Sequence, residues 1–360
     1  MKSRHLILAL SALMAPSGFA EKMTWKTGEL QLKSAGALAF GEAGVLFIGD
    51  AEGANVTAID TGDKTPVSQP RDLNVIDLAA PIAQMTGSSS DEIKVHDLAV
   101  NLISGQAYLT ATRGGGDSAI ALLVRVGGPD DIEVMDLASL PHMRLDLADA
   151  PKAGNGGRRD PRGMSVTDLG FHDGMLYVAG LSNEEFASKL RIFAFPFDGE
   201  DRGTSVEVYH GAHGAWETRS PIRTFLPMAI EGEAHLVAGY TCTPLVTFPV
   251  KALQADAKLR GKTVAELGNR NTPLDMVLYK KDGADFLLIA NTSRGVMKVS
   301  TAGLAKQAEI TTRISDKAGL KYETIEDLTD VTQLAGLDDK RALMLFEADG
   351  LVSLEAIELP

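Results

Sequence analysis

Cysteine is nearly absent from this chain of 360 residues, which contains only one, Cys242. A single cysteine cannot form a disulfide within the chain, so a hydrophobic core alone must hold the folded state. The same count excludes paired Cys-x-x-Cys metal sites and the Cys-x-x-Cys-His attachment site of c-type haem. We therefore expect no haem. Because a lone cysteine in a protein is commonly buried, we expect Cys242 to be shielded beneath the rim of the fold.

Long apolar runs are also missing. After the first 20 residues, no segment approaches the roughly 18 uninterrupted apolar residues that span a bilayer. The chain begins with two basic residues, a short apolar run over 6–14, and small residues near position 20, a pattern typical of a secretory signal. We predict a signal peptide over 1–20, a single domain over 21–360, a location in the periplasm or outside the cell, and no membrane insertion.

Positively charged residues are fewer than negatively charged ones. Lysine and arginine number 35 against 48 aspartates and glutamates, which gives a formal net charge of −13. This balance argues against nucleic acid or an anionic membrane as a partner. We expect a monomer that binds a small molecule or another periplasmic protein.

Local catalytic signatures are absent as well. The sequence contains no Gly-x-Ser-x-Gly, His-Glu-x-x-His or EF-hand loop, which removes the best-known hydrolase and calcium motifs. The glycine-rich stretch over 112–118 lacks the Gly-Lys-Ser/Thr end of a phosphate-binding loop. Function must therefore be sought in an arrangement of residues rather than in a motif.

An internal repeat is present. Each unit has a short apolar strand, a polar turn, a second strand rich in Val, Ile, Leu and Tyr, another turn, and a third alternating strand. The units begin at Gly36, His96, Thr167, Thr224, Leu274 and Thr332. Six such units predict an all-β, six-bladed β-propeller.

Three segments between or before these units need an interpretation. The alternating stretch over 24–34 is predicted to supply the missing strand of the last unit, which would close the ring and remove a sheet edge. Insertions over 74–85 and 250–267 are predicted to be helical or irregular. The alternative to six blades is a seventh, hidden over 141–163.

Register places several polar residues at one end of the channel. In a propeller blade the first strand lines the channel, and the second runs back antiparallel to it. Asp97, Asp168 and Asp275 take equivalent positions near the starts of their first strands. Each could fix local backbone through its own hydrogen bonds. Alternatively, together with Asn291 at a second-strand end, they could hold a divalent cation such as Ca²⁺, which takes six to eight oxygen ligands.

Other candidates belong to the same predicted mouth. His96, beside Asp97, is the candidate general base. For Cys242, the alternatives to burial are a soft-metal ligand or a reactive thiol. The candidate ligand-binding residues are Asp50, Arg113, Arg223, Cys242 and Arg294.

His210 and His213 have a spacing that occurs in some metal sites. They fall in a glycine-rich connector, and we identify no carboxylate or third histidine at a diagnostic interval from them. The sequence therefore predicts an ordinary connector there rather than a metal site.

Blade patterns such as GQAYLTATRG (105–114) and GMLYVAGLS (174–182) resemble those of the secreted six-bladed propellers grouped with gluconolactonases, strictosidine synthase and the YVTN-type proteins. In gluconolactonase-like members, acidic and amide side chains hold a divalent cation on the axis. The resemblance implies that role for Asp97, Asp168, Asp275 and Asn291.

Two functions of different classes follow. The first is a binding protein that holds a small ligand or a partner protein at the channel mouth. The alternative is a metal-assisted, lactonase-like hydrolase at the same mouth, with a cation polarising a carbonyl and His96 as the base. A fold alone does not choose between them, and the missing catalytic motifs favour binding.

Overall fold

The computed structural model describes residues 24–154, 160–242 and 244–360. The predicted signal peptide lies outside these residues. No helix within the described ranges is long and apolar enough to cross a membrane.

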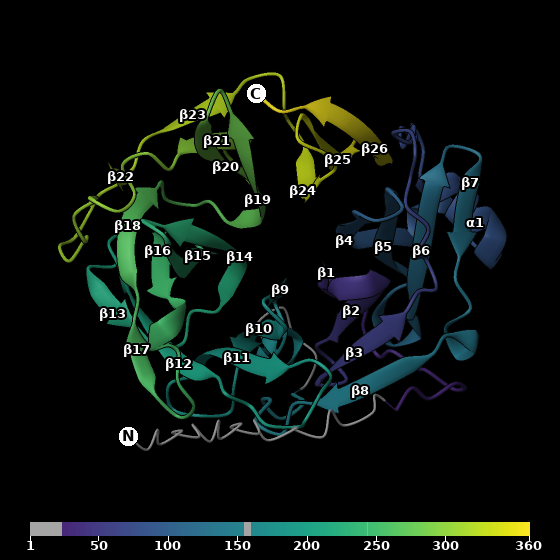
Figure 1. The fold of residues 1–360 in the computed structure, drawn as a ribbon, viewed down its shortest axis with the longest axis horizontal. Coiled ribbons are helices and arrows are strands. Elements are labelled where there is room, and N and C mark those ends of the chain that lie inside the picture. The colour runs from purple at the N-terminus through teal and green to yellow at the C-terminus, as the bar shows by residue number, and fades with distance from the viewer. Residues whose placement is uncertain (1–23, 155–159, 243) are drawn as a thin grey trace, which may run out of the picture.

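Six β-sheets surround a common axis, as the prediction of a six-bladed β-propeller required (Figure 1). Each blade is named here by its first strand. The β1 blade contains β1 (Leu38–Phe40), β2 (Val45–Asp50), β3 (Asn55–Asp60) and β8 (His142–Asp146). The β4 blade contains β4 (Ile93–Asn101), β5 (Gln106–Arg113), β6 (Ile120–Gly128) and β7 (Asp131–Val134). The β9 blade contains β9 (Asp168–His172), β10 (Met175–Leu181), β11 (Ser188–Ala194) and β12 (Thr204–His210), with β13 (Ala215–Glu217) and β17 (Lys258–Arg260) both paired to β12.

The remaining three blades follow along the chain. The β14 blade contains β14 (Ile222–Ile230), β15 (Glu233–Tyr240), β16 (Pro244–Pro249), β18 (Lys262–Leu267) and β22 (Lys317–Gly319). The β19 blade contains β19 (Pro273–Lys281), β20 (Ala284–Asn291), β21 (Val296–Ser300) and β23 (Tyr322–Ile325). The β24 blade contains β24 (Val331–Gly336), β25 (Arg341–Ala348) and β26 (Leu351–Glu358).

Turn chemistry explains why the strands pair with their neighbours in sequence. The hairpins β9–β10, β19–β20 and β25–β26 all turn on an Asp-Gly pair. Both residues have positive φ: 50° and 72° at Asp173-Gly174, and 52° and 79° at Asp282-Gly283. Two consecutive residues with positive φ match the twist of a two-residue hairpin, and Asp-Gly is a preferred pair for it. The alternative of a seventh blade over 141–163 is wrong, because this region supplies β8, the outermost strand of the β1 blade.

The blades do not follow one another around the ring in sequence order. Six clusters of buried apolar residues lie between neighbouring blades. Leu46 of the β1 blade packs with Tyr108 of the β4 blade, and Phe47 packs with Leu176 of the β9 blade. Leu109 of the β4 blade shares a cluster with Leu345 of the β24 blade. The ring order is therefore β4, β1, β9, β14, β19, β24. The chain first forms β1 to β3 of the β1 blade. It then forms the whole β4 blade on one side of it, and comes back to add β8 to the β1 blade.

Ring closure differs from the prediction. The last blade has only three strands, and the connector ahead of α1 (Ala79–Thr86) covers its edge. Val75 N donates to Leu354 O over 2.8 Å, and Leu354 N donates to Val75 O over 2.9 Å. The assignment of 24–34 to this edge is wrong, because that segment lies on the β1 blade, where Lys26 bridges His142. An alternating pattern indicates an extended segment without specifying which sheet edge it meets.

The two predicted insertions have different outcomes. The first, over 74–85, contains most of α1, so its helical character is confirmed. The second, over 250–267, contains a single 3-10 turn followed by β17 and β18, so its prediction as a helical or irregular insertion is wrong. β18 fills a regular outer-strand position in the β14 blade.

Replacing Asn74 by Ala tests the observed closure. The exposed Asn74 accepts a hydrogen bond from Ala356 N through Oδ1, over 2.8 Å. Its loss should lower the free energy of unfolding by about 1 kcal/mol. Gln307→Ala, at a half-buried position whose side chain makes only a weak local hydrogen bond (3.3 Å), is the control in urea unfolding. Equal stability of the two variants would argue against this edge contact.

Candidate functional site

A cavity of about 300 Å³ opens on the channel axis, at the starts of the first strands. Its walls include Asp97 from β4, Asp168 from β9 and Asp275 from β19. His96 and Arg223 line it too. The structure thus brings together the three aspartates, the candidate base and one candidate arginine.

Each axial aspartate is held by two backbone N–H groups. One belongs to the next residue in its own strand, and the other to the first strand of a neighbouring blade. The donors to Asp168 are Leu169 N and Phe225 N, both over 2.7 Å. The donors to Asp97 are Leu98 N over 2.9 Å and Leu38 N over 2.5 Å. The donors to Asp275 are Met276 N and Leu334 N, both over 2.7 Å.

These bonds join the blades in three pairs: β4 with β1, β9 with β14, and β19 with β24. Backbone irregularity helps to aim two of the carboxylates, since β4 shifts register between Val95 and Asp97, and β19 between Pro273 and Asp275. Such bulges re-aim side chains next to a site. The fixed backbone donors hold each carboxylate in one orientation.

The electrostatics of the cavity are dominated by the burial of three carboxyl groups close to one another. Burial, followed by repulsion from Asp97, raises the pKa of Asp168 to about 8. Burial also raises the pKa of Asp97 to about 7. The pKa of Asp275 is raised well above its usual value by burial and by the other two carboxylates. Loss of solvent and like charges both disfavour the ionised form.

Arg223 is the arginine that faces these carboxylates. Burial lowers the pKa of its guanidinium, and Asp168 partly offsets that effect. Within the described part of the chain, Arg223 Nε is buried and has no hydrogen-bond partner. A buried donor without a partner costs free energy, and a bound ligand could recover that cost.

His96 has its ring Nε2 2.9 Å from Thr112 Oγ1. Burial, assisted by Lys94, lowers the pKa of His96 to about 4, so the imidazole is neutral near pH 7. Its backbone oxygen accepts from Gln333 Nε2 over 3.0 Å, linking the β4 and β24 blades. Gln333 and Thr167 also line the cavity. Sequence reasoning did not single them out, although both lie at the starts of repeat units.

Two acidic or amide candidates lie away from the cavity wall. Asn291 uses its side chain in the turn after β20, donating to Ile289 O over 2.9 Å and accepting from Asn271 Nδ2 over 2.8 Å. Asp50 is fully buried. Its carboxylate accepts from Ser34 N over 2.9 Å and Asn55 Nδ2 over 3.0 Å, anchoring the N-terminal segment to β2.

The other candidates hold local structure. Arg113 donates to Thr86 O, at the end of α1. Arg294 donates to Asp316 Oδ1 over 3.1 Å. Cys242 occupies a left-handed turn with φ of 61° and is half-buried. The expectation that it is fully buried beneath the rim is therefore wrong, since its side chain is partly exposed.

Direct coordination of one ion needs ligand atoms closer together than the axial aspartates place them. In the described ranges, the one group of three metal-ligating side chains whose ligand atoms all lie within 4.8 Å of one another is His210, His213 and Glu217. The axial carboxylates thus surround a space wider than a bare metal ion.

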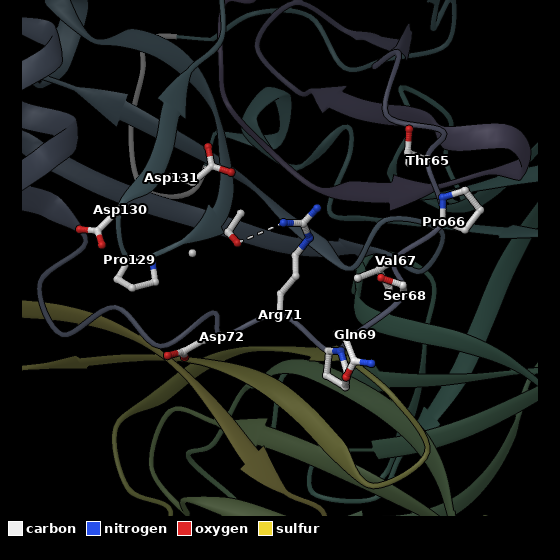
Figure 2. Close-up of a pocket in the computed structure, with 13 residues that line it drawn as sticks. Thr65, Pro66, Val67, Ser68, Gln69, Arg71, Asp72, Pro129, Asp130 and Asp131 are labelled. Atoms are coloured by element: carbon white, nitrogen blue, oxygen red, sulfur yellow. Dashed lines mark hydrogen bonds between the residues drawn. The ribbon is translucent and has the colours of Figure 1, made fainter.

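A larger cavity, of about 580 Å³, lies on the outer side of the β4 blade between the loops 65–72 and 127–131. Arg71 extends between these loops toward Gly127 O, while the acidic side chains lie at the edges (Figure 2). Asp131 forms an ion pair with Arg125 over 3.0 Å. No lining side chain has a buried polar atom without a partner, so we assign no site to this space.

Comparisons with known proteins add little to this geometry. No protein-family model matches the sequence, and no curated protein does. Similar solved structures include a glucose dehydrogenase, with 10% identity, 94% of this chain and 100% of that chain covered, and a TM-score of 0.37. A PQQ-bound aldose sugar dehydrogenase from Streptomyces coelicolor shares 12% identity over 92% of this chain and 97% of its own, with a TM-score of 0.33. The extracellular region of plexin A4 shares 9% identity over 91% of this chain and 46% of its own, with a TM-score of 0.43. Likenesses this weak carry no argument about function.

Proposed function

We propose that this protein is a binding protein that holds a small, positively charged solute at the mouth of its channel. The observation that carries the proposal is the convergence of Asp97, Asp168 and Asp275 on one cavity. Burial raises the pKa values of all three, and repulsion between the carboxylates raises those of Asp168 and Asp275 further. A bound cation would relieve this repulsion, so the cavity favours such a ligand.

The carboxylates are suited to accept hydrogen bonds from a ligand. An ionised carboxylate offers about four lone-pair positions, and each axial aspartate uses two of them on backbone N–H groups. The remaining positions are held in a fixed orientation, which reduces the entropy lost when a ligand binds. An ammonium group, with three donors, matches this arrangement of acceptors.

Arg223 suggests a second feature of the ligand. Its buried Nε needs an acceptor, and a carboxylate or hydroxyl oxygen on the ligand would provide one. A solute with an ammonium at one end and an oxygen acceptor at the other would satisfy both sides of the cavity. The volume of about 300 Å³ is at the lower end of the range for small-molecule sites.

The alternative, a metal-assisted hydrolase of the lactonase type, has less support. A general base works best with a pKa near the working pH, whereas the pKa of His96 is about 4. The candidate cation, Ca²⁺, would also have to draw carboxylates together that are spread around the cavity. The hydrolase therefore remains the second candidate.

We also infer that the protein works in the periplasm or outside the cell. This proposal rests on the signal-like pattern of its first 20 residues. The net charge of −13 supports a protein that stays dispersed rather than one that binds nucleic acid.

Calorimetric titration with a panel of small amines tests the proposed ligand class. The panel pairs ethanolamine and lysine with uncharged or anionic analogues of similar size. We expect at least one amine to bind, and Asp168→Asn to weaken it at least tenfold. Asp146→Asn, at an exposed position, is the control and should bind as the wild type does. Binding of the anionic analogues alone, or equal binding by Asp168→Asn, would contradict the proposal.

A further inference from the structure

A second cluster of ligand-type side chains lies at the outer edge of the β9 blade, apart from the axial cavity. His210 ends β12, Glu217 ends β13, and His213 lies in the turn between these strands. Glu266, in β18 of the neighbouring β14 blade, reaches this turn and accepts from Gly211 N over 2.5 Å. None of these residues lines the axial cavity.

Both histidines point the same ring nitrogen at one carboxylate. His210 Nδ1 lies 3.1 Å from Glu217 Oε2, and His213 Nδ1 lies 2.5 Å from Glu217 Oε1. The two imidazole rings are 4.0 Å apart between centroids. The three side chains therefore offer one ligand atom each, and these atoms lie within 4.8 Å of one another.

The local backbone brings these groups together. Gly214 N donates to His210 O over 2.8 Å, and His213 N donates to the same oxygen over 3.1 Å, so the chain makes one helical turn. The turn is completed by Gly214, whose φ is 68°. Residues three apart on such a turn lie on one side. Pairing of His210 with Ala215 in β13 makes Glu217 the diagonal neighbour of His210 across the hairpin.

Buried polar atoms without partners are a second, independent feature of this cluster. His210 is only 3% exposed, and Glu266 only 1%. Within the described residues, His210 Nε2 and Glu266 Oε2 are both buried without a hydrogen-bond partner. Buried polar groups in native proteins are normally satisfied, so such exceptions require an explanation. For the Glu266 carboxylate, a cation bound beside this turn is one.

We propose that His210, His213 and Glu217 bind one divalent transition-metal ion of the Zn²⁺ class. Two imidazole nitrogens and one carboxylate oxygen form a donor set that suits Zn²⁺ and its neighbours rather than Ca²⁺, which prefers oxygen alone. Three protein ligands leave a fourth position of a tetrahedral ion open to water or a small ligand.

The present hydrogen bonds resemble a closed, metal-free form of such a site. Each Nδ1–H now donates to Glu217. When the metal takes the Nδ1 lone pairs, the proton of each neutral imidazole moves to Nε2, so no proton is lost. Ser220 Oγ already donates to Glu217 Oε2 and would keep the ligating carboxylate oriented, as outer hydrogen bonds do in metal sites. Glu266 adds a second carboxylate beside the site.

The test uses tag-free protein, stripped of metal with a chelator, and ZnCl₂ as the only probe. Calorimetric titration should show one Zn²⁺ bound per chain. His213→Ala should weaken binding at least tenfold. The side chain of His213 is 57% exposed, so this variant is expected to fold, and circular dichroism checks that it does. His172→Ala removes another exposed histidine and should leave the affinity unchanged.

Two further measurements separate this site from the channel mouth. Asp168→Asn should bind Zn²⁺ as the wild type does. Electron paramagnetic resonance of the Cu²⁺-loaded protein should show coupling to two nitrogens, and His213→Ala should show one. Absence of saturable Zn²⁺ binding, unchanged affinity in His213→Ala, or loss of binding in Asp168→Asn instead would each overturn the proposal.

Discussion

Asp149→Asn is expected to lower the free energy of unfolding by about 3–5 kcal/mol, because it leaves a buried guanidinium without its counter-charge. Arg191 in β11 is fully buried. Its Nε donates to Asp149 Oδ1 over 2.7 Å, while Nη1 and Nη2 donate to Ser165 O and Leu181 O over 3.0 and 2.9 Å. The guanidinium thus ties the segment after β8 to the β9 blade, the next blade that the chain forms.

Asp146→Asn is the matched control. Asp146 pairs with Arg144 over 2.7 Å, but the side chains are 74% and 43% exposed. Exposed pairs contribute about 0–1 kcal/mol, so little stability should be lost. Urea unfolding of both variants measures the difference. Similar midpoints for the two would show that Arg191 does not depend on Asp149 for its charge balance.

The free energy of unfolding of Asp168→Asn, taken relative to wild type, is expected to rise with pH. The folded-state pKa of Asp168 is raised from 3.8 to about 8, so the folded protein binds a proton that the unfolded chain has released. Asp168 therefore makes the folded state lose stability as pH rises from about 4 to 8. At about pH 3 the carboxyl group is protonated in both states, so the variant differs only because Asn has a single acceptor oxygen for the two donors Leu169 N and Phe225 N.

The stability of Asp168→Asn relative to wild type should therefore be lowest at about pH 3, where it reflects only the lost acceptor, and should rise as pH increases to about 8. One pKa unit corresponds to about 1.4 kcal/mol. With solvent in the cavity screening part of the repulsion, we expect this relative stability to rise by on the order of 2 kcal/mol between pH 3 and pH 9. Asp173→Asn, at an exposed hairpin position in the same blade, should show no such dependence. A relative stability that does not rise between pH 3 and pH 9 would mean that the aspartate charge is balanced in the folded state.

Much of this fold follows from local patterns in the sequence. The starts of all six first strands could be located because strand alternation and Asp-Gly turns act over a few residues. The ring order could not, because it depends on where the connector between β3 and α1 leads. That connector carries the chain past the neighbouring blade and places Val75 on the edge of β26. The polar composition of this connector does not indicate which blade it reaches.

The site shows the same division between local and long-range information. Asp97, Asp168 and Asp275 could be placed on one face from their equivalent positions in the repeat. Their bonds to Leu38, Phe225 and Leu334 could not be foreseen, since they cross from blade to blade.

The histidine cluster illustrates a signal that was present and missed. Glu217 follows His213 by four residues, a spacing that sets a carboxylate beside a histidine. The prediction that no carboxylate accompanies the two histidines is therefore wrong. Glu266 lies 55 residues from Gly211 in sequence, and no local pattern indicates that it reaches the turn.

The most direct test of the axial site is a pH titration of the aspartate carboxyl carbons by ¹³C NMR, with selective labelling and Asp168→Asn for assignment. If the three carboxylates share the channel mouth without enough positive charge, the Asp168 signal should titrate near pH 8 and that of Asp97 near pH 7. An added amine ligand should move both midpoints down, because a bound cation favours the ionised form. Midpoints below about 5 in the ligand-free protein, within the range of ordinary aspartates, would contradict the proposed cation-binding site.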